Sequence, residues 1–218
     1  MSDTRARELM ATVPEAVPQR PIRRYSNVAV TFHWVVVALV LTQVVIGFTF
    51  AEFLPRGPER AALFTWHKTL GATILLLTLA RLAYRLKNPP PPFPPELPHW
   101  RRIAAVWNHR LFYVALILLP LTGLIAVSDG AKSWFTPLVG GVPLPVVPGI
   151  DEATGEMSGD VHVVLVFTTI ALLLLHVGAA VYQQFFEHDR TAGRMPPFQA
   201  PGEEAVIGQG GLAPPLEG

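Results

Sequence analysis

The chain has 218 residues, of which 50% are hydrophobic and only 15% are charged, against about a quarter charged in a typical soluble domain. Its mean hydropathy of +0.37 is too high for a soluble domain of this size, so the composition favours a lipid-facing surface. The net charge of +1 argues against nucleic acid as a partner, and the lack of cysteine excludes disulfides, iron–sulfur clusters, thiolate-bound zinc and covalently attached haem.

The two ends of the chain are predicted to be disordered tails. Residues 1–27 contain several arginines and prolines but no apolar run, so they do not form a cleavable signal peptide. Residues 187–218 are rich in proline and glycine. The segment between them, residues 28–186, is predicted to be one membrane domain.

Four segments of this domain are long and apolar enough to cross a bilayer, which takes about 20 helical residues. They span about 28–50, 65–86, 110–128 and 159–186. Each is nearly uniform in hydrophobicity around its circumference, unlike the one-sided stripe of a soluble helix. The sequence therefore predicts an all-α integral membrane protein, a four-helix transmembrane bundle.

The charges of the connections predict the orientation of this bundle. The connection between the second and third helices is basic, with Arg85, Lys87, Arg101, Arg102 and Arg110 against Glu96. The connection between the third and fourth helices is acidic, with Asp129, Asp151, Glu152, Glu156 and Asp160 against Lys132. By the positive-inside rule, both chain termini and the second connection face the cytoplasm, and the first and third connections lie outside. In a Gram-negative bacterium this corresponds to a multi-pass protein of the inner membrane, with those two connections in the periplasm.

Four histidines lie within the predicted spans, where ionisable side chains are costly and are therefore candidates for function. His33 lies about six residues into the first helix from the cytoplasmic side. His67 and His162 each lie about three residues into their helices from the outer side. His176 follows His162 by 14 residues, a descent of about 21 Å in about four turns, so these two share one face of the fourth helix.

The matched depths divide these histidines into two pairs. We call His33 and His176 the tail-side pair, because both chain termini are expected on that side, and His67 and His162 the loop-side pair. A lone histidine at a helix end is explained equally well by a structural hydrogen bond. Two axial nitrogens from different helices are, however, what a haem in a bundle core needs. The sequence thus predicts two b-type haems, one bound by each pair.

Three further residues are candidates for contacts with haem propionates. Arg81 follows His67 by 14 residues, so it lies on nearly the same face at the level of the tail-side pair, and Arg85 follows one turn later. Snorkelling to lipid headgroups is an alternative that suits Arg85 better than Arg81. His109, at the cytoplasmic end of the third helix, fits a propionate contact and an interfacial position equally well.

Several short motifs together point to a known family. They are Arg24-Tyr25-Ser26, Phe32-His33-Trp34, Trp66-His67-Lys68, the run from Arg81 to Lys87, Asn108-His109, Leu119-Pro120-Leu121-Thr122-Gly123 and Trp134-Phe135, followed by His162 and His176. This combination resembles the bacterial cytochrome b-561 family, four-helix dihaem membrane proteins also known as superoxide oxidases. The resemblance covers about residues 24–196, with departures in the long tails and at Val106, where many relatives carry a histidine.

The resemblance implies bis-histidine haem b at both levels and electron exchange with ubiquinone. Some members of the family oxidise superoxide at the outer face and reduce quinone in the membrane. Cationic side chains should steer such an anion, and the candidates are Lys68 and Lys132, with Arg56 and Arg60 as weaker ones. The acidic third connection argues against a broad positive funnel.

Three functions stay open at this point. The first is electron transfer from an outer donor to ubiquinone, either as an oxidoreductase or as a pure electron carrier, because two axial histidines leave the iron no open position. The second is a cytochrome b subunit that relays electrons to quinone within a larger hydrogenase- or dehydrogenase-type complex. The third is a non-redox membrane anchor or transporter, although the spans lack the set of intramembrane acids that an ion transporter would use. The expected partners are membrane lipid, quinone and a redox protein.

Overall fold

The computed structural model describes residues 22–93, 97–130, 133–187, 194–195 and 205–207. Its four long helices are α2 (Asn27–Phe48), α3 (Pro58–Lys87), α4 (His99–Val127) and α5 (Glu152–Tyr182). All four are long and apolar enough to cross a membrane, which confirms the predicted fold class. The predicted tails, 1–27 and 187–218, lie largely outside the described residues.

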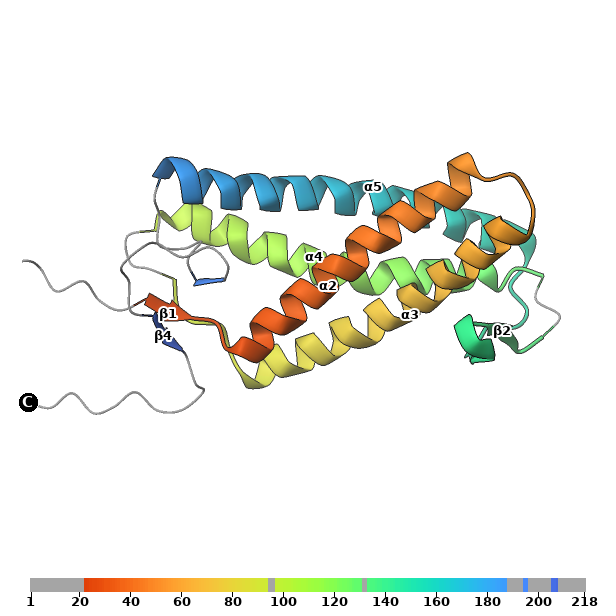
Figure 1. The fold of residues 1–218 in the computed structure, drawn as a ribbon, viewed down its shortest axis with the longest axis horizontal. Coiled ribbons are helices and arrows are strands. Elements are labelled where there is room, and N and C mark those ends of the chain that lie inside the picture. Colours follow the sequence, from red (N-terminus) through yellow and green to blue (C-terminus); the bar gives the residue numbers. More distant parts are fainter. Residues whose placement is uncertain (1–21, 94–96, 131–132, 188–193, 196–204, 208–218) are drawn as a thin grey trace, which may run out of the picture.

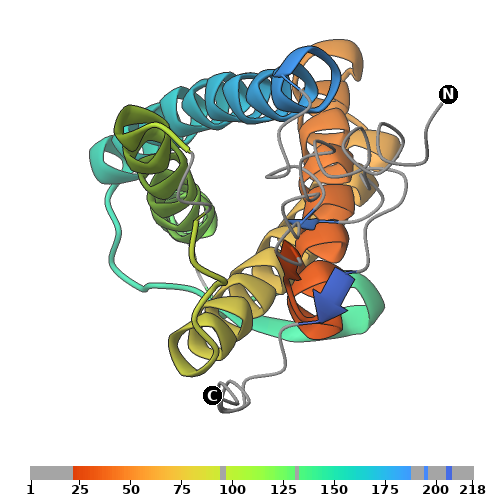
Figure 2. The same cartoon turned by 90° about the vertical axis from the view of Figure 1, so that its left-hand side faces the viewer.

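The helices form an up-and-down bundle in which consecutive helices run antiparallel (Figure 1). The most extensive packing is between α4 and α5 and between α2 and α3. Seen end-on, the four helices surround a common axis (Figure 2). At the tail-side end of the bundle, strand β1 (Ile22–Arg24) pairs in parallel with β4 (Ala205–Ile207).

The buried core of the bundle is small and lies near the middle of its length. Val36, Ile74 and Leu116, from three different helices, form its centre, with partly buried leucine and valine side chains around them. Many large apolar side chains instead point outward; Leu76 is 68% exposed and Leu174 is 69% exposed. An apolar surface of this extent is expected where lipid, and not water, is the surrounding solvent.

Three helices begin earlier than their hydropathy predicts. α3 begins at Pro58 rather than near 65, α4 at His99 rather than near 110, and α5 at Glu152 rather than near 159. Hydropathy marks the part of a helix that lies in hydrocarbon, whereas polar turns continue the helix into the interface. Helix-start residues support these extensions: Pro58 stands at the first helical position of α3, and the side chain of Asp151 caps α5.

Two of the long helices end in short π-helices. α2 continues into η1 (Thr49–Phe53) at the loop-side end, and α5 continues into η3 (Gln183–Glu187) at the tail-side end. Single-turn π segments are frequent near functional sites. The first of them places Phe50 against the ring of His67, at a centroid distance of 5.1 Å.

The connection between α4 and α5 folds into a small hairpin against the loop-side end. Strand β2 (Phe135–Pro137) pairs antiparallel with β3 (Pro143–Pro145), around the short 3₁₀ turn η2 (Val139–Gly141). Two hydrogen bonds tie this hairpin to α3: Lys68 Nζ donates to Thr136 Oγ1 at 2.7 Å, and the backbone N–H of Val139 donates to Thr69 Oγ1 at 3.0 Å. Lys68 and Thr69 directly follow His67, so the hairpin lies close to the loop-side pair.

Candidate haem-binding sites

The structure brings together the two histidine pairs that the sequence predicts. The rings of His33 on α2 and His176 on α5 have centroids 6.3 Å apart and planes inclined by 61°. Those of His67 on α3 and His162 on α5 are 6.1 Å apart and inclined by 70°. Two imidazoles that bind one metal from opposite sides, each with its nitrogen about 2 Å away, have ring centres about 6 Å apart. Both pairs therefore fit two axial ligands of one iron.

A cavity adjoins the tail-side pair. Its empty volume is about 690 Å³, counting space that is open to the surroundings. The walls are mostly aliphatic and aromatic, but they include Thr78, Arg81, His109 and Tyr113. The Thr78 and Tyr113 hydroxyls are buried and have no hydrogen-bond partner among the described residues. An apolar cavity with a few unpartnered polar groups suits a planar apolar cofactor that carries polar substituents.

Two arginines flank one aromatic ring beside this cavity. The guanidinium carbons of Arg81 and Arg85 lie 5.8 and 5.9 Å from the centre of the Tyr113 ring. Arg81 also reaches the tail-side pair, with its Nη2 3.4 Å from Nδ1 of His33. Both side chains are half-buried, and Arg81 lines the cavity, where a cation could neutralise a propionate carboxylate. That assignment stays a prediction.

His109 packs beside the tail-side pair as well. Its ring centroid is 5.4 Å from that of His176, with the two planes nearly perpendicular at 89°. Its Nδ1 lies 2.7 Å from the carbonyl oxygen of Ala105, and since a carbonyl only accepts, the ring proton is on Nδ1. A hydrogen bond from His109 to a propionate would therefore need a second proton on Nε2.

The loop-side pair rests on two glycines. A Cβ atom added at Gly47 on α2 would lie 3.2 Å from Cε1 of His67, and one added at Gly123 on α4 would lie 3.3 Å from Cε1 of His162. Each imidazole thus lies directly over the backbone of the neighbouring helix. Only glycine leaves this approach unhindered. Hydropathy alone does not reveal these contacts, because they depend on the rotation of each helix about its axis.

The cations predicted to steer an anion have different surroundings. Lys68 is hydrogen-bonded to Thr136 and lies 5.3 Å over the Phe64 ring, and Arg60 donates to the carbonyl oxygen of Leu54 at 3.1 Å. Arg56 is exposed. Lys132 lies outside the described residues.

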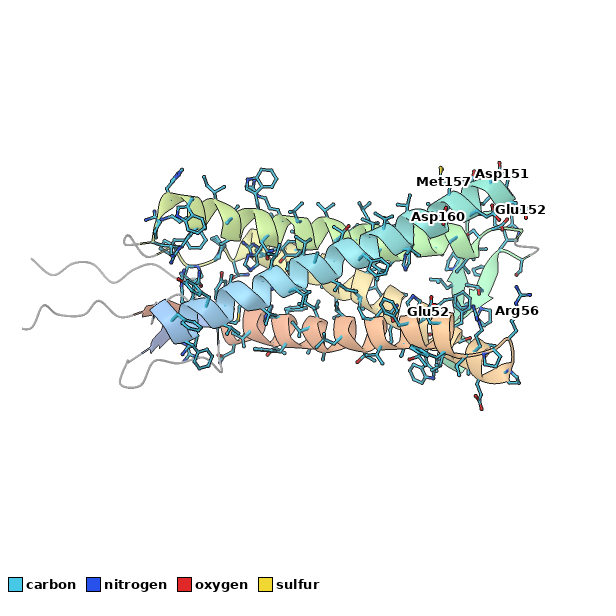
Figure 3. All side chains as sticks on the ribbon, turned by 90° about the horizontal axis from the view of Figure 1, so that it is seen from above. Glu52, Arg56, Asp151, Glu152, Met157 and Asp160 are labelled. Atoms are coloured by element: carbon cyan, nitrogen blue, oxygen red, sulfur yellow. The ribbon has the colours of Figure 1, made fainter. Side chains whose placement is uncertain are left out.

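Acidic side chains dominate the same end of the bundle. Figure 3 shows the exposed residues Glu52, Asp151, Glu152 and Asp160 there, with Arg56 as the one labelled cation. The electrostatic potential at this end therefore attracts an anion only close to its cations, among them Lys68, Arg56 and Arg60.

Comparison with known proteins supports one family. Residues 24–197, most of the chain, match the family described as prokaryotic cytochrome b561. "Cytochrome b561 homolog 1" of Escherichia coli (strain K12) is 25% identical over 182 residues, covering 81% of this chain and 98% of the relative. "Cytochrome b561 homolog 2" of the same strain is 24% identical over 183 residues, covering 79% and 90%. "Probable superoxide oxidase CybB" of Yersinia pestis is 26% identical over 185 residues, covering 80% and 97%.

The family match agrees with the four apolar helices and with two histidine pairs at the spacing of axial ligands. It excludes the reading of the chain as a non-redox anchor or transporter. Haem b is the cofactor that the family implies, and the apolar cavity and the glycine-lined histidines fit it. The chain belongs to the prokaryotic cytochrome b561 family and is a bacterial membrane cytochrome of the b type that acts in electron transfer.

Proposed function

We propose that this protein carries electrons through two haems b, from a donor at the loop-side end to ubiquinone in the membrane. The observation that carries the proposal is the pairing of four histidines at two levels, each pair at the ring spacing of two axial ligands. Helix α5 contributes one histidine to each pair. Since His176 follows His162 by 14 residues, the levels are about 21 Å apart along α5.

Each haem, held by two histidines, would supply a one-electron redox centre that exchanges electrons without binding oxygen. His33 and His176 would hold one haem, and His67 and His162 the other. Val36, Ile74 and Leu116 pack together as an aliphatic core, and Val36 and Leu116 also line the cavity beside the tail-side pair. Arg81 and Arg85 are placed to neutralise propionates at the tail-side level.

Superoxide is the donor that we favour, by analogy with the relative from Yersinia pestis. Two superoxide anions would each give up one electron and leave as dioxygen, and ubiquinone would take up the two electrons and two protons to form ubiquinol. Lys68 stands next to His67 in sequence and is the cation nearest to the loop-side pair along the chain. It would attract the anion at the point where its electron enters.

The orientation follows from the charges at the two ends. Arg85, Lys87, Arg101 and Arg102 all lie at the tail-side end of α3 and α4. We therefore place both termini in the cytoplasm and the β2–β3 hairpin outside. A reporter enzyme that works only in the cytoplasm should therefore be active when it is fused to either terminus.

A rapid superoxide pulse tests the donor. Purified oxidised protein should show haem reduction much faster than the spontaneous dismutation of superoxide, and added ubiquinone should then reoxidise the haems. Lys68→Gln should slow the first step, whereas Lys87→Gln, at the opposite end, should leave it unchanged. Haem reduction no faster than in a buffer control would rule out superoxide as the donor.

A second candidate function is a subunit that receives its electrons from a partner protein. The acid-rich loop-side end, with Glu52, Asp151, Glu152 and Asp160 exposed, favours a donor with a basic surface over a small anion (Figure 3). Purification from native membranes at low ionic strength distinguishes the two. A stoichiometric partner that reduces the haems and dissociates at high salt would favour the subunit; its absence, together with fast reduction by superoxide, would favour the enzyme.

A further inference from the structure

One short segment of α4, Leu119–Gly123, surrounds a single side chain of α5. The carbonyl oxygen of Leu119 lies 2.9 Å from Nδ1 of His162, and Thr122 Oγ1 lies 3.2 Å from the same nitrogen. A Cβ atom at Gly123 would lie 3.3 Å from Cε1 of that ring. The Leu119 carbonyl, the Thr122 hydroxyl and the backbone at Gly123 therefore all lie against the imidazole of His162.

These contacts fix the proton of His162. A carbonyl oxygen has no proton to donate, so Nδ1 must carry the hydrogen in the bond to Leu119. Nε2 then keeps its lone pair, which is the form of histidine that binds a metal. A ligand histidine whose second nitrogen donates to a carbonyl is both oriented and made a stronger electron donor.

The rest of the turn supports this arrangement. Pro120 has no N–H, so it cannot continue the hydrogen-bond ladder of α4, and ladders interrupted in this way bend. The Thr122 hydroxyl lies 2.9 Å from the carbonyl oxygens of both Leu118 and Leu119. Ser158, one turn before His162 on α5, is buried and donates to the carbonyl oxygen of Thr122 at 2.9 Å. This bond locks the two helices together beside the histidine.

His67, the other member of the loop-side pair, is held differently. Its Nδ1 is buried and has no hydrogen-bond partner in the part of the chain that the structure describes. Apart from its pairing with His162, its ring lies over the backbone at Gly47 and packs at a steep angle against the Phe50 ring, with 5.1 Å between centroids. Packing restricts where this ring lies, but no hydrogen bond selects its tautomer or strengthens its lone pair.

From this contrast we infer that Leu119–Gly123 is a positioning element that makes His162 the fixed, electron-rich ligand of the loop-side haem and leaves His67 the compliant one. The inference rests on the proposed haem ligation. Stronger donation from His162 stabilises oxidised iron, so weakening the bond to Leu119 should raise the midpoint potential of that haem.

Three glycine variants of the full-length haem protein test the inference. In Gly123→Ala the new methyl group would press on the His162 ring and lengthen its bond to the Leu119 carbonyl. In Gly47→Ala it would press on His67, which has no such bond to lose. Gly178→Ala on α5 is the matched control, because a Cβ atom there would meet no described atom within 4 Å. Redox titration followed by absorbance gives both midpoint potentials, and electron paramagnetic resonance reports the ligand field of each haem.

The expected result is a raised midpoint potential for one haem in Gly123→Ala, with a changed low-spin signal for the same haem and the other haem unaffected. Gly47→Ala should give a smaller shift, and Gly178→Ala none. If Gly123→Ala does not fold, Ser158→Ala should give a weaker shift of the same sign in the same haem. Equal shifts in Gly47→Ala and Gly123→Ala, or wild-type potentials in both Gly123→Ala and Ser158→Ala, would overturn the inference. A wild-type protein without haem would instead overturn the proposed function.

Discussion

Replacing Gly155 with alanine should push the first turn of α5 away from the turn that follows α4. A Cβ atom at Gly155 would lie 2.5 Å from the Cβ and 3.0 Å from the Cγ of Asp129. A Cβ atom is fixed to its backbone, so rotating a side chain cannot relieve this overlap. The turn after α4 that carries Asp129, or the first turn of α5, must therefore shift by about 1 Å. Overpacking of this kind costs about 1–3 kcal/mol of unfolding free energy.

Gly159, one turn further along α5, is the matched control. A Cβ atom there would lie 4.0 Å from the Cβ of Ala126, an ordinary contact, so Gly159→Ala should gain the helix propensity of alanine, about 0.5–1 kcal/mol. The two variants should therefore shift stability in opposite directions. Detergent-solubilised proteins can be titrated with a denaturing detergent while helicity is followed by circular dichroism. Equal midpoints for Gly155→Ala and Gly159→Ala would refute the close packing of Gly155 against Asp129.

Three more predictions concern single side chains. Arg81→Gln should lower the midpoint potential of the tail-side haem. Removing a nearby cation destabilises the reduced haem by on the order of 1 kcal/mol, which corresponds to about 40 mV. An unchanged potential would place Arg81 away from that haem. Lys68→Gln should slow haem reduction by superoxide up to about fivefold, as expected for the loss of one charge in water. Thr136→Val breaks the hydrogen bond to Lys68 but keeps the charge, so it should not slow this reaction. Equal slowing in both variants would mean that Lys68 acts by holding the hairpin on α3 and not by its charge. Hydrogen bonds from Thr154 hold the pKa of Asp151 below its usual value. The Asp151 carboxylate therefore stabilises the fold above its usual pKa, and this stabilisation is lost as the pH falls through the lowered pKa. Asp151→Asn, which keeps a capping side chain, should remove this pH dependence in melting curves, and Asp151→Ala should also lower stability near neutral pH.

The fold class and the pairing of histidines by depth follow from the sequence, since both depend only on hydropathy and on the rise of an α-helix. His162 and His176 share a face because 14 residues make about four turns, and the structure places each beside its expected partner. The helix ends do not follow in the same way. At the start of α4, Arg101 and Arg102 belong to the helix although they are too polar for a hydropathy window.

Contacts between helices are harder to predict from the sequence than the fold class or the pairing of the histidines. In the sequence, Gly47 and Gly123 are only glycines within apolar spans, whereas the structure shows that each faces one histidine ring. The hydrogen bond from His162 to the Leu119 carbonyl depends on how α4 and α5 are rotated about their axes, which no periodicity encodes. The β2–β3 hairpin was not expected either, because strands of three residues with prolines at their ends carry little pattern.

Haem quantification and reduced-minus-oxidised spectra of four single variants test the central claim most directly. The variants are His33→Ala, His67→Ala, His162→Ala and His176→Ala, with His99→Ala as the control that should keep both haems. Each of the four should lose one haem; His33→Ala and His176→Ala should lose the same one, and His67→Ala and His162→Ala the other. A variant of these four that keeps both haems in their bis-histidine form, or loss of the same haem from His162→Ala and His176→Ala, would contradict the account.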